Sequence, residues 1–146
     1  MITRVGFYVV QDAAPEAASL VAAVLAEKAL QRGHRIFVLT QNLDHSEAVH
    51  TAFWNFKRDG FLPCSLGDSD ADSPIVIHHD LPAANHHDCL INLSLKTDSF
   101  ASRFQRIVEI VTQQETHLDA MREAWRWYKH RGFRLEKHDV ARPNPV

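Results

Sequence analysis

The segment between residues 5 and 40 constrains the fold of this chain most, because it holds two apolar strand-like runs around a helix-like one. Val5–Val10 is a nearly continuous apolar run, VGFYVV, which is typical of a parallel strand buried on both faces. Apolar residues at helical spacing follow from Pro15 to Arg32, Gly33 ends that helix, and Arg35–Thr40 has the composition of a second buried strand. This order predicts a βαβ unit with a right-handed crossover.

The same alternation continues along the rest of the chain. Two further helices are expected, from Glu47 to Phe56 with Ser46 as the N-cap, and from Phe100 to Val111. Short strands are expected at 61–63, 75–77 and 89–93, a long helix at 114–131, and an edge strand at 133–137. The pattern predicts a three-layer α/β sandwich with a mainly parallel sheet and Rossmann-like topology. We expect one domain over residues 1–138 and a loose tail over 139–146.

Composition narrows the class of protein further. A chain of 146 residues with 45% hydrophobic and 23% charged residues is typical of one globular domain. No apolar run approaches the ~20 residues that a membrane span needs. Cys64 and Cys89 lack CxxC spacing, so we expect reduced thiols and a cytoplasmic protein. The formal charge of −2 predicts that any DNA contact is weak or indirect.

A nucleotide site is not expected, although the predicted topology is one that often carries such a site. None of the five glycines is spaced as GxGxxG, and no glycine-rich run ends in Gly-Lys-Ser or Gly-Lys-Thr. After the first strand, where the phosphate cradle would lie, the chain has QDAAPE, whose acidic groups would repel a phosphate. We therefore expect no cofactor.

A histidine-rich segment offers one enzymatic alternative. The four histidines His78, His79, His86 and His87, each pair followed by an aspartate, could form the metal site of a metal-dependent hydrolase. Adjacent residues on an extended segment point to opposite faces, so only one histidine of each pair could easily reach a shared ion. Solvated loop histidines are the simpler interpretation, and we expect neither a metal nor catalysis.

The last long helix combines an apolar stripe with basic side chains. Its apolar positions, at helical spacing, are Leu118, Met121, Trp125 and Tyr128. Its neighbouring cations are Arg122, Arg126 and Lys129. The pattern alone is most often a core stripe with solvated basic neighbours. The alternative is a dock for an acidic peptide that carries an apolar anchor.

Several short motifs along the chain together resemble a known family. In order, they are Phe7-Tyr8, Trp54, Phe61-Leu62-Pro63, Leu90–Leu93 and Gly132-Phe133. This combination resembles the chi subunit of bacterial DNA polymerase III, over nearly the whole chain. The resemblance implies a non-catalytic accessory protein that joins the clamp loader, through the psi subunit, to the C-terminal tail of single-stranded DNA-binding protein.

The resemblance also implies where that tail would bind. The tail is acidic and ends in an aromatic residue that carries the terminal carboxylate. The peptide-binding residues implied by the matched positions are Trp54, Val111, Leu118, Arg122, Trp125, Arg126 and Lys129. Val111 and Trp125 would line a slot for the terminal ring, and Arg122 would pair with the carboxylate.

The remaining implied residues would surround that slot. Arg126 and Lys129 would attract the acidic segment, and Trp54 could pack at the rim. Leu118 stands where the family often has a lysine, so the pocket is expected to be more apolar here. No residues can be assigned to a psi interface from the sequence.

Overall fold

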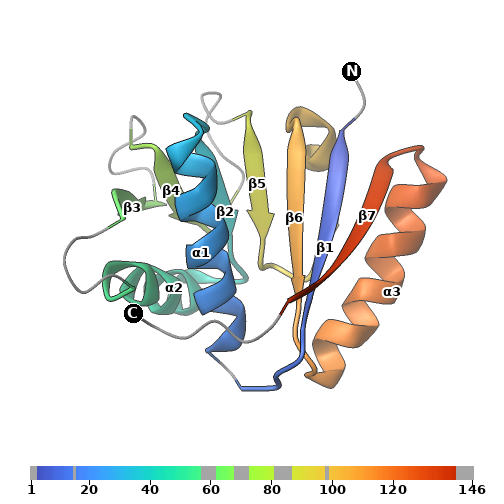
Figure 1. Cartoon of the computed structure of the whole chain (residues 1–146), viewed down its shortest axis with the longest axis horizontal. Coiled ribbons are helices and arrows are strands. Elements are labelled where there is room, and N and C mark those ends of the chain that lie inside the picture. Colours follow the sequence, from blue (N-terminus) through green and yellow to red (C-terminus); the bar gives the residue numbers. More distant parts are fainter. Residues whose placement is uncertain are drawn as a thin grey trace.

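The fold is a single parallel sheet covered by helices on both faces (Figure 1). A computed structural model describes residues 3–14, 16–56, 62–67, 73–80, 87–97 and 99–140. Its strands are β1 (Arg4–Val10), β2 (Ile36–Leu39), β3 (Cys64–Leu66), β4 (Ile75–His78), β5 (Cys89–Asn92), β6 (Arg106–Val111) and β7 (Arg134–Val140). Its helices are α1 (Ala17–Gln31), α2 (Leu43–Trp54), the 3₁₀ helix η2 (Ser99–Arg103) and α3 (Glu115–His130).

The described strands form one sheet in the order β3-β4-β2-β5-β6-β1-β7, and every pairing is parallel. Helices α1 and α2 pack on one face of this sheet, while α3 and η2 pack on the other. Figure 1 shows α2 toward the β3 edge and α3 beside β7, at opposite ends of the sheet. The predicted three-layer, Rossmann-like α/β class is therefore confirmed, with a sheet that is parallel throughout.

The first strand shows why its sequence is apolar at nearly every position. Val5, Phe7 and Val9 join the core on the α3 face, whereas Val10 joins the core under α1. A central strand needs apolar side chains on both faces because helices cover both. Gly33, with φ of 81°, follows α1 and leads into β2. The predicted strand-helix-glycine-strand unit is present, although Pro15, the expected first helical residue, lies outside the described residues.

The helix predicted from Phe100 to Val111 is wrong. The chain forms the short helix η2 and then the strand β6 between β5 and β1. Ile107 and Val111 point into the core under α3, while Val108 belongs to the core under α1. A strand buried on both faces has apolar residues at successive positions, and these happen to include the i, i+3, i+4 and i+7 spacing of a helix.

Helix α2 begins earlier than the sequence pattern indicated. It starts at Leu43, and the side chain of Asn42 accepts a hydrogen bond of 2.8 Å from the backbone N–H of His45. Ser46, the predicted N-cap, lies inside the helix, is buried, and pairs with the hydroxyl of Thr40. Asn42 and Ser46 are equally good N-cap residues by type. Which of them begins the helix depends on where β2 ends, and β2 ends at Leu39.

The predicted last helix and edge strand are both present. Gly132, with φ of 80°, follows α3, and the N–H of Phe133 donates to the carbonyl of Tyr128 at 3.1 Å. Strand β7 then pairs only with β1 among the described strands. It extends through Val140, two residues into the segment expected to be a loose tail. Residues 141–146 lie outside the described residues.

Candidate functional site

Helix α3 is fixed to the sheet by one buried line of side chains. Ala124 and Tyr128 are buried, and the Tyr128 ring packs edge-on against Phe7 of β1, with 6.0 Å between the ring centroids. The Tyr128 hydroxyl donates a 2.7 Å hydrogen bond to the Glu109 carboxylate on β6. This anchoring leaves two flanks of α3, one directed toward β7 and one toward β5.

The β7 flank of α3 combines an aromatic ring with cations. Leu118, Arg122, Trp125 and Lys129 recur at helical spacing and therefore share this side of the helix. The Trp125 ring is half-buried and packs on Phe7, with 5.1 Å between centroids and 50° between planes. Leu118 is also half-buried in the same apolar cluster. We call this set, together with Arg126, the α3 flank.

The cations of the α3 flank are exposed. Arg122 makes an ion pair of 3.1 Å with Asp119, and the two side chains are 70% and 65% exposed. An exposed pair of this kind contributes little to stability, so an incoming carboxylate could take the place of Asp119. Arg126 and Lys129 are exposed on the same helix. The flank therefore offers a partly covered aromatic ring bordered by three guanidinium or ammonium groups.

Two of the residues expected in the same site lie elsewhere. Val111, at the end of β6, is only 3% exposed and lies beneath α3 on the side away from the α3 flank. Trp54, 53% exposed, ends α2 on the opposite face of the sheet, where its ring stacks on His50 with 6.4 Å between centroids. The structure therefore brings together five of the seven predicted residues and leaves Val111 and Trp54 apart from them.

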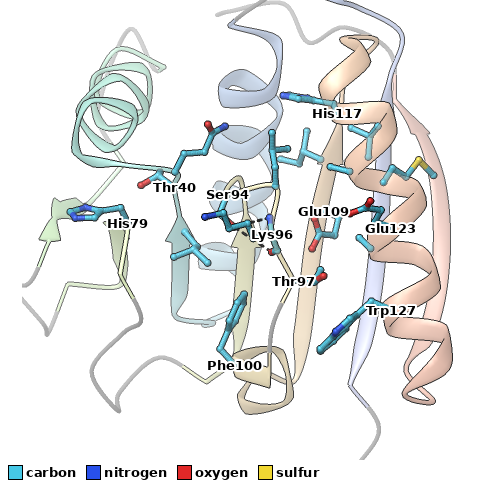
Figure 2. A pocket seen from close by; sticks show the side chains of 18 of the residues that line it. Thr40, His79, Ser94, Lys96, Thr97, Phe100, Glu109, His117, Glu123 and Trp127 are labelled. Carbon is cyan, nitrogen blue, oxygen red and sulfur yellow. Dashed lines mark hydrogen bonds between the residues drawn. The ribbon is translucent and has the colours of Figure 1, made fainter.

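A pocket of about 830 Å³ opens on the other flank of α3 (Figure 2). Its walls are the carboxyl ends of β2, β5 and β6 and the side of α3 that carries Glu123 and Trp127. Such crevices outside the carboxyl ends of parallel strands are where open α/β folds commonly bind ligands. The sequence did not reveal this pocket, because its walls come from strands and a helix that are distant from one another along the chain.

The buried polar group of that pocket is Glu109. It lies between the sheet and α3 (Figure 2), and it accepts hydrogen bonds from Tyr128 and, at 2.9 Å, from the side-chain amide of Asn92. Burial raises the pKa of Glu109 to about 7, against a smaller lowering by these two hydrogen bonds. A glutamate inside the apolar run Ile107–Val111 was the sequence signal that could have revealed it.

In the turn that follows β1, an acidic side chain occupies a backbone donor. The Asp12 carboxylate accepts a 2.8 Å hydrogen bond from the N–H of Ala14. A backbone donor that could otherwise bind an anion is thus already paired with a negative charge. The absence of a nucleotide site therefore stays a prediction.

Comparison with known proteins decides the family. The family model described as DNA polymerase III chi subunit, HolC, matches residues 2–136. The DNA polymerase III subunit chi of Pseudomonas aeruginosa is 34% identical over 141 residues, which cover 97% of this chain and 99% of that protein. The chain belongs to the DNA polymerase III chi subunit family.

Among solved structures, this chi-family chain is similar in fold to T4 UvsW. The TM-score is 0.66 at 10% sequence identity, over 97% of this chain and 42% of the UvsW chain. At that identity the likeness concerns the fold alone. No helix within the described ranges is both long and apolar enough to cross a membrane.

The histidine-rich segment of this chi-family protein is described only in part. His78 ends β4 and its ring meets that of His79 edge-on, with 4.7 Å between centroids. His87 precedes β5, whereas His86 lies outside the described residues. Among the residues with described positions, no group of three or more histidine, cysteine or acidic side chains could hold a metal ion.

Proposed function

We propose that this protein is a non-catalytic accessory subunit of DNA polymerase III that joins the clamp loader to single-stranded DNA-binding protein. Membership of the chi family supports the assignment to the polymerase. The proposed binding to single-stranded DNA-binding protein is supported by the α3 flank, where the half-buried Trp125 ring lies beside exposed Arg122, Arg126 and Lys129. This surface suits an acidic peptide that ends in an aromatic residue.

Each part of the α3 flank has a separate role in the proposed binding mode. The terminal ring of the peptide packs against Trp125 and Leu118, whose inner sides already rest on the core. Arg122 exchanges its exposed partner Asp119 for the terminal carboxylate, which a guanidinium can bind through two hydrogen bonds. Arg126 and Lys129 attract the acidic residues that precede the terminal ring, mainly by raising the association rate.

The psi subunit is proposed to bind the outer side of α2. Leu43 and Trp54, 54% and 53% exposed, are eleven positions apart and therefore lie on the same side of that helix. An exposed tryptophan is a frequent anchor in protein interfaces. Because α2 and α3 cover opposite faces of the sheet, the protein could hold psi and the tail at the same time.

A titration with a fluorescently labelled acidic peptide that ends in Phe tests the tail site. We expect a Kd in the micromolar range, on the order of −8 kcal/mol, as for a small anchored interface. A peptide of the same sequence with a C-terminal amide should bind about tenfold more weakly, because it offers Arg122 no charged partner. Equal affinities of the two peptides would exclude carboxylate capture.

The variant Trp54→Ala separates the two proposed interfaces. It should weaken binding to psi in a pull-down or titration by about 2 kcal/mol, as loss of an aromatic anchor does. It should leave the affinity for the tail peptide unchanged, since Trp54 and the α3 flank lie on opposite faces. A parallel loss of peptide affinity would show that the two surfaces are not independent.

A further inference from the structure

A second hollow, of about 460 Å³, lies between α1 and the sheet on the face opposite α3. Cations from three parts of the chain line it: Arg4 on β1, Lys28 and Arg32 at the end of α1, and Arg106 on β6. Asp88 is the acidic residue among the described lining, and its carboxylate accepts a 2.8 Å hydrogen bond from the backbone N–H of Arg35. Positive charge is therefore concentrated here in a chain whose formal charge is −2.

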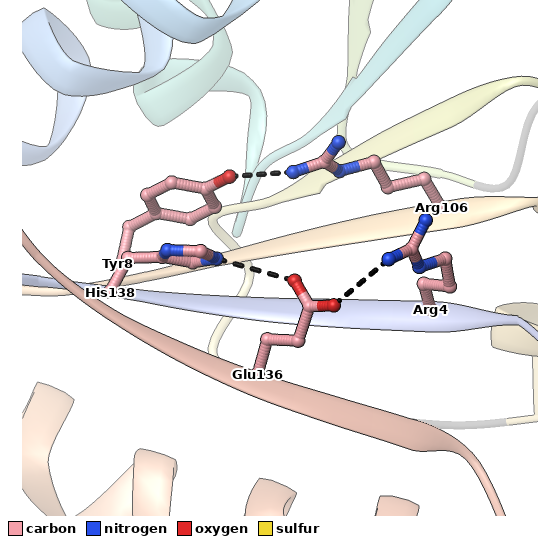
Figure 3. A network of polar contacts seen from close by, with 5 residues as sticks. All are labelled: Arg4, Tyr8, Arg106, Glu136 and His138. Atoms are coloured by element: carbon pink, nitrogen blue, oxygen red, sulfur yellow. Dashed lines mark hydrogen bonds and ion pairs between the residues drawn. The ribbon is translucent and has the colours of Figure 1, made fainter.

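An aromatic pair adjoins these cations on the same face (Figure 3). The rings of Tyr8 and His138 stack with 4.7 Å between centroids and 20° between planes. The Tyr8 ring approaches β1 closely at Gly6, which has no side chain; a Cβ there would come within 2.9 Å of the ring. The Tyr8 hydroxyl accepts a 2.7 Å hydrogen bond from Arg106, which directs that guanidinium along the edge of the hollow.

Glu136 orders the β7 side of this surface. Its carboxylate pairs with Arg4 at 3.1 Å and lies 3.4 Å from the His138 ring (Figure 3). The contact with Arg4 lowers the pKa of Glu136, which keeps the carboxylate charged. Arg4 is thus largely neutralised. Among the described ion pairs of Glu136 and Asp88, none involves Lys28 or Arg32, so these two cations keep their charge available.

We propose that this hollow and the Tyr8–His138 pair bind single-stranded DNA. Arg106, Arg32 and Lys28 would contact successive phosphates, and the exposed side of the aromatic pair would stack on a base. Proteins usually bind single-stranded DNA with two features: cations that follow the phosphate backbone, and aromatic rings on which any base can stack. The hollow brings cations from separate parts of the chain beside two stacked rings. This arrangement suits a strand in which phosphates and bases alternate, so the observations favour DNA.

The proposal is independent of tail binding, because the hollow and the α3 flank lie on opposite faces of the sheet. Contact with about three phosphates predicts weak, strongly salt-dependent binding, with log K falling against log salt with a slope of about −2. Binding should also depend on the presence of bases, although not on their sequence, because stacking reads no base edge.

Fluorescence anisotropy with a labelled oligothymidylate at low salt tests the cations. The variant Arg32→Gln/Arg106→Gln should lower affinity about tenfold and reduce the slope by about 1.4, for two lost phosphate contacts. The matched control Arg122→Gln/Arg126→Gln removes the same charge from the α3 flank. It should leave DNA affinity within about twofold of wild type while weakening the tail peptide. Equal losses of DNA affinity in both variants, or no binding by the wild-type protein, would overturn the proposal.

An abasic oligomer of the same length tests the aromatic pair without changing the protein. It keeps every phosphate and should bind about tenfold more weakly than oligothymidylate, with the same salt slope. Equal affinity for the abasic oligomer would remove the stacking role. Displacement of oligothymidylate by polyglutamate at equal charge concentration would show instead that the hollow binds an acidic protein segment, and would also overturn the proposal.

Discussion

Trp125 performs two tasks that can be separated by measurement. Its inner side packs on Phe7 and so contributes to the core, while the rest of the ring belongs to the α3 flank. Truncation should therefore affect folding and peptide binding by different amounts. Phe7, which is fully buried, offers the contrasting case of a ring that serves the core alone.

The variant Trp125→Ala should lose about 2 kcal/mol of peptide affinity, as truncated aromatic anchors do. Its free energy of unfolding should fall by about 2 kcal/mol, below the 3–5 kcal/mol that is typical of fully buried large aromatic residues. Urea unfolding and peptide titration on the same preparation give both values. Severe destabilisation with unchanged affinity in the folded fraction would place Trp125 in the core and outside the binding site.

Glu109 should make stability depend on pH. Burial raises its pKa from 4.5 in the exposed state to about 7 in the folded chain. The folded protein thus keeps a proton that the unfolded chain loses. The stability that this proton contributes is complete below about pH 4.5 and is lost as pH rises to about 7. The loss amounts to about 3 kcal/mol, at 1.36 kcal/mol for each pH unit.

The variant Glu109→Gln cannot ionise but keeps an oxygen that can accept from Tyr128 and Asn92. Its stability relative to wild type should therefore rise by about 3 kcal/mol between pH 4.5 and pH 8. Urea unfolding over that range gives the difference. Burial lowers the pKa values of His45 and His117, and their opposing contribution cancels in the comparison. A difference that is constant with pH would show that Glu109 titrates normally.

Among the helices and strands, the sequence predicted most accurately those whose apolar pattern fits either a helix or a strand but not both. The βαβ unit followed from an apolar run, a helical repeat and Gly33, and α3 followed from its apolar stripe and Gly132. Strand β6 was predicted as a helix because its neighbours in the sheet, which bury both of its faces, cannot be seen in a single sequence. Pairing partners, and with them the order of the strands, are set by contacts between distant segments.

Gly132 illustrates a local requirement that the sequence does reveal. Its φ of 80° lies in the left-handed region, and a Cβ would meet nothing within 4 Å. The variant Gly132→Ala should therefore cost about 1 kcal/mol of stability through backbone strain alone. Thermal unfolding measures this cost, and tail-peptide affinity should stay unchanged. A much larger loss would mean that a side chain at this position clashes with neighbouring segments, and would contradict the open space around Gly132.

At the scale of the whole molecule, one sheet separates the proposed surfaces. The α3 flank lies on one face of the sheet. The outer side of α2, proposed for psi, and the hollow between α1 and the sheet lie on the other face. Sequence motifs identified the family. The five implied residues of the last helix share one flank because helical spacing alone decides which residues of a helix lie together. The motifs placed Trp54 and Val111 in the same site because a motif gives chain position but not the face of the sheet on which a residue lies.

If Arg122 binds the terminal carboxylate of the tail, a double-mutant cycle should show an energetic coupling between these two groups. The four affinities to measure are those of wild type and Arg122→Ala, each with the free-acid and the amide peptide. We predict that Arg122→Ala weakens the free-acid peptide by about 1.5–3 kcal/mol and the amide peptide by far less, which gives a coupling energy above about 1 kcal/mol. Equal effects of Arg122→Ala on the two peptides would contradict carboxylate binding by Arg122.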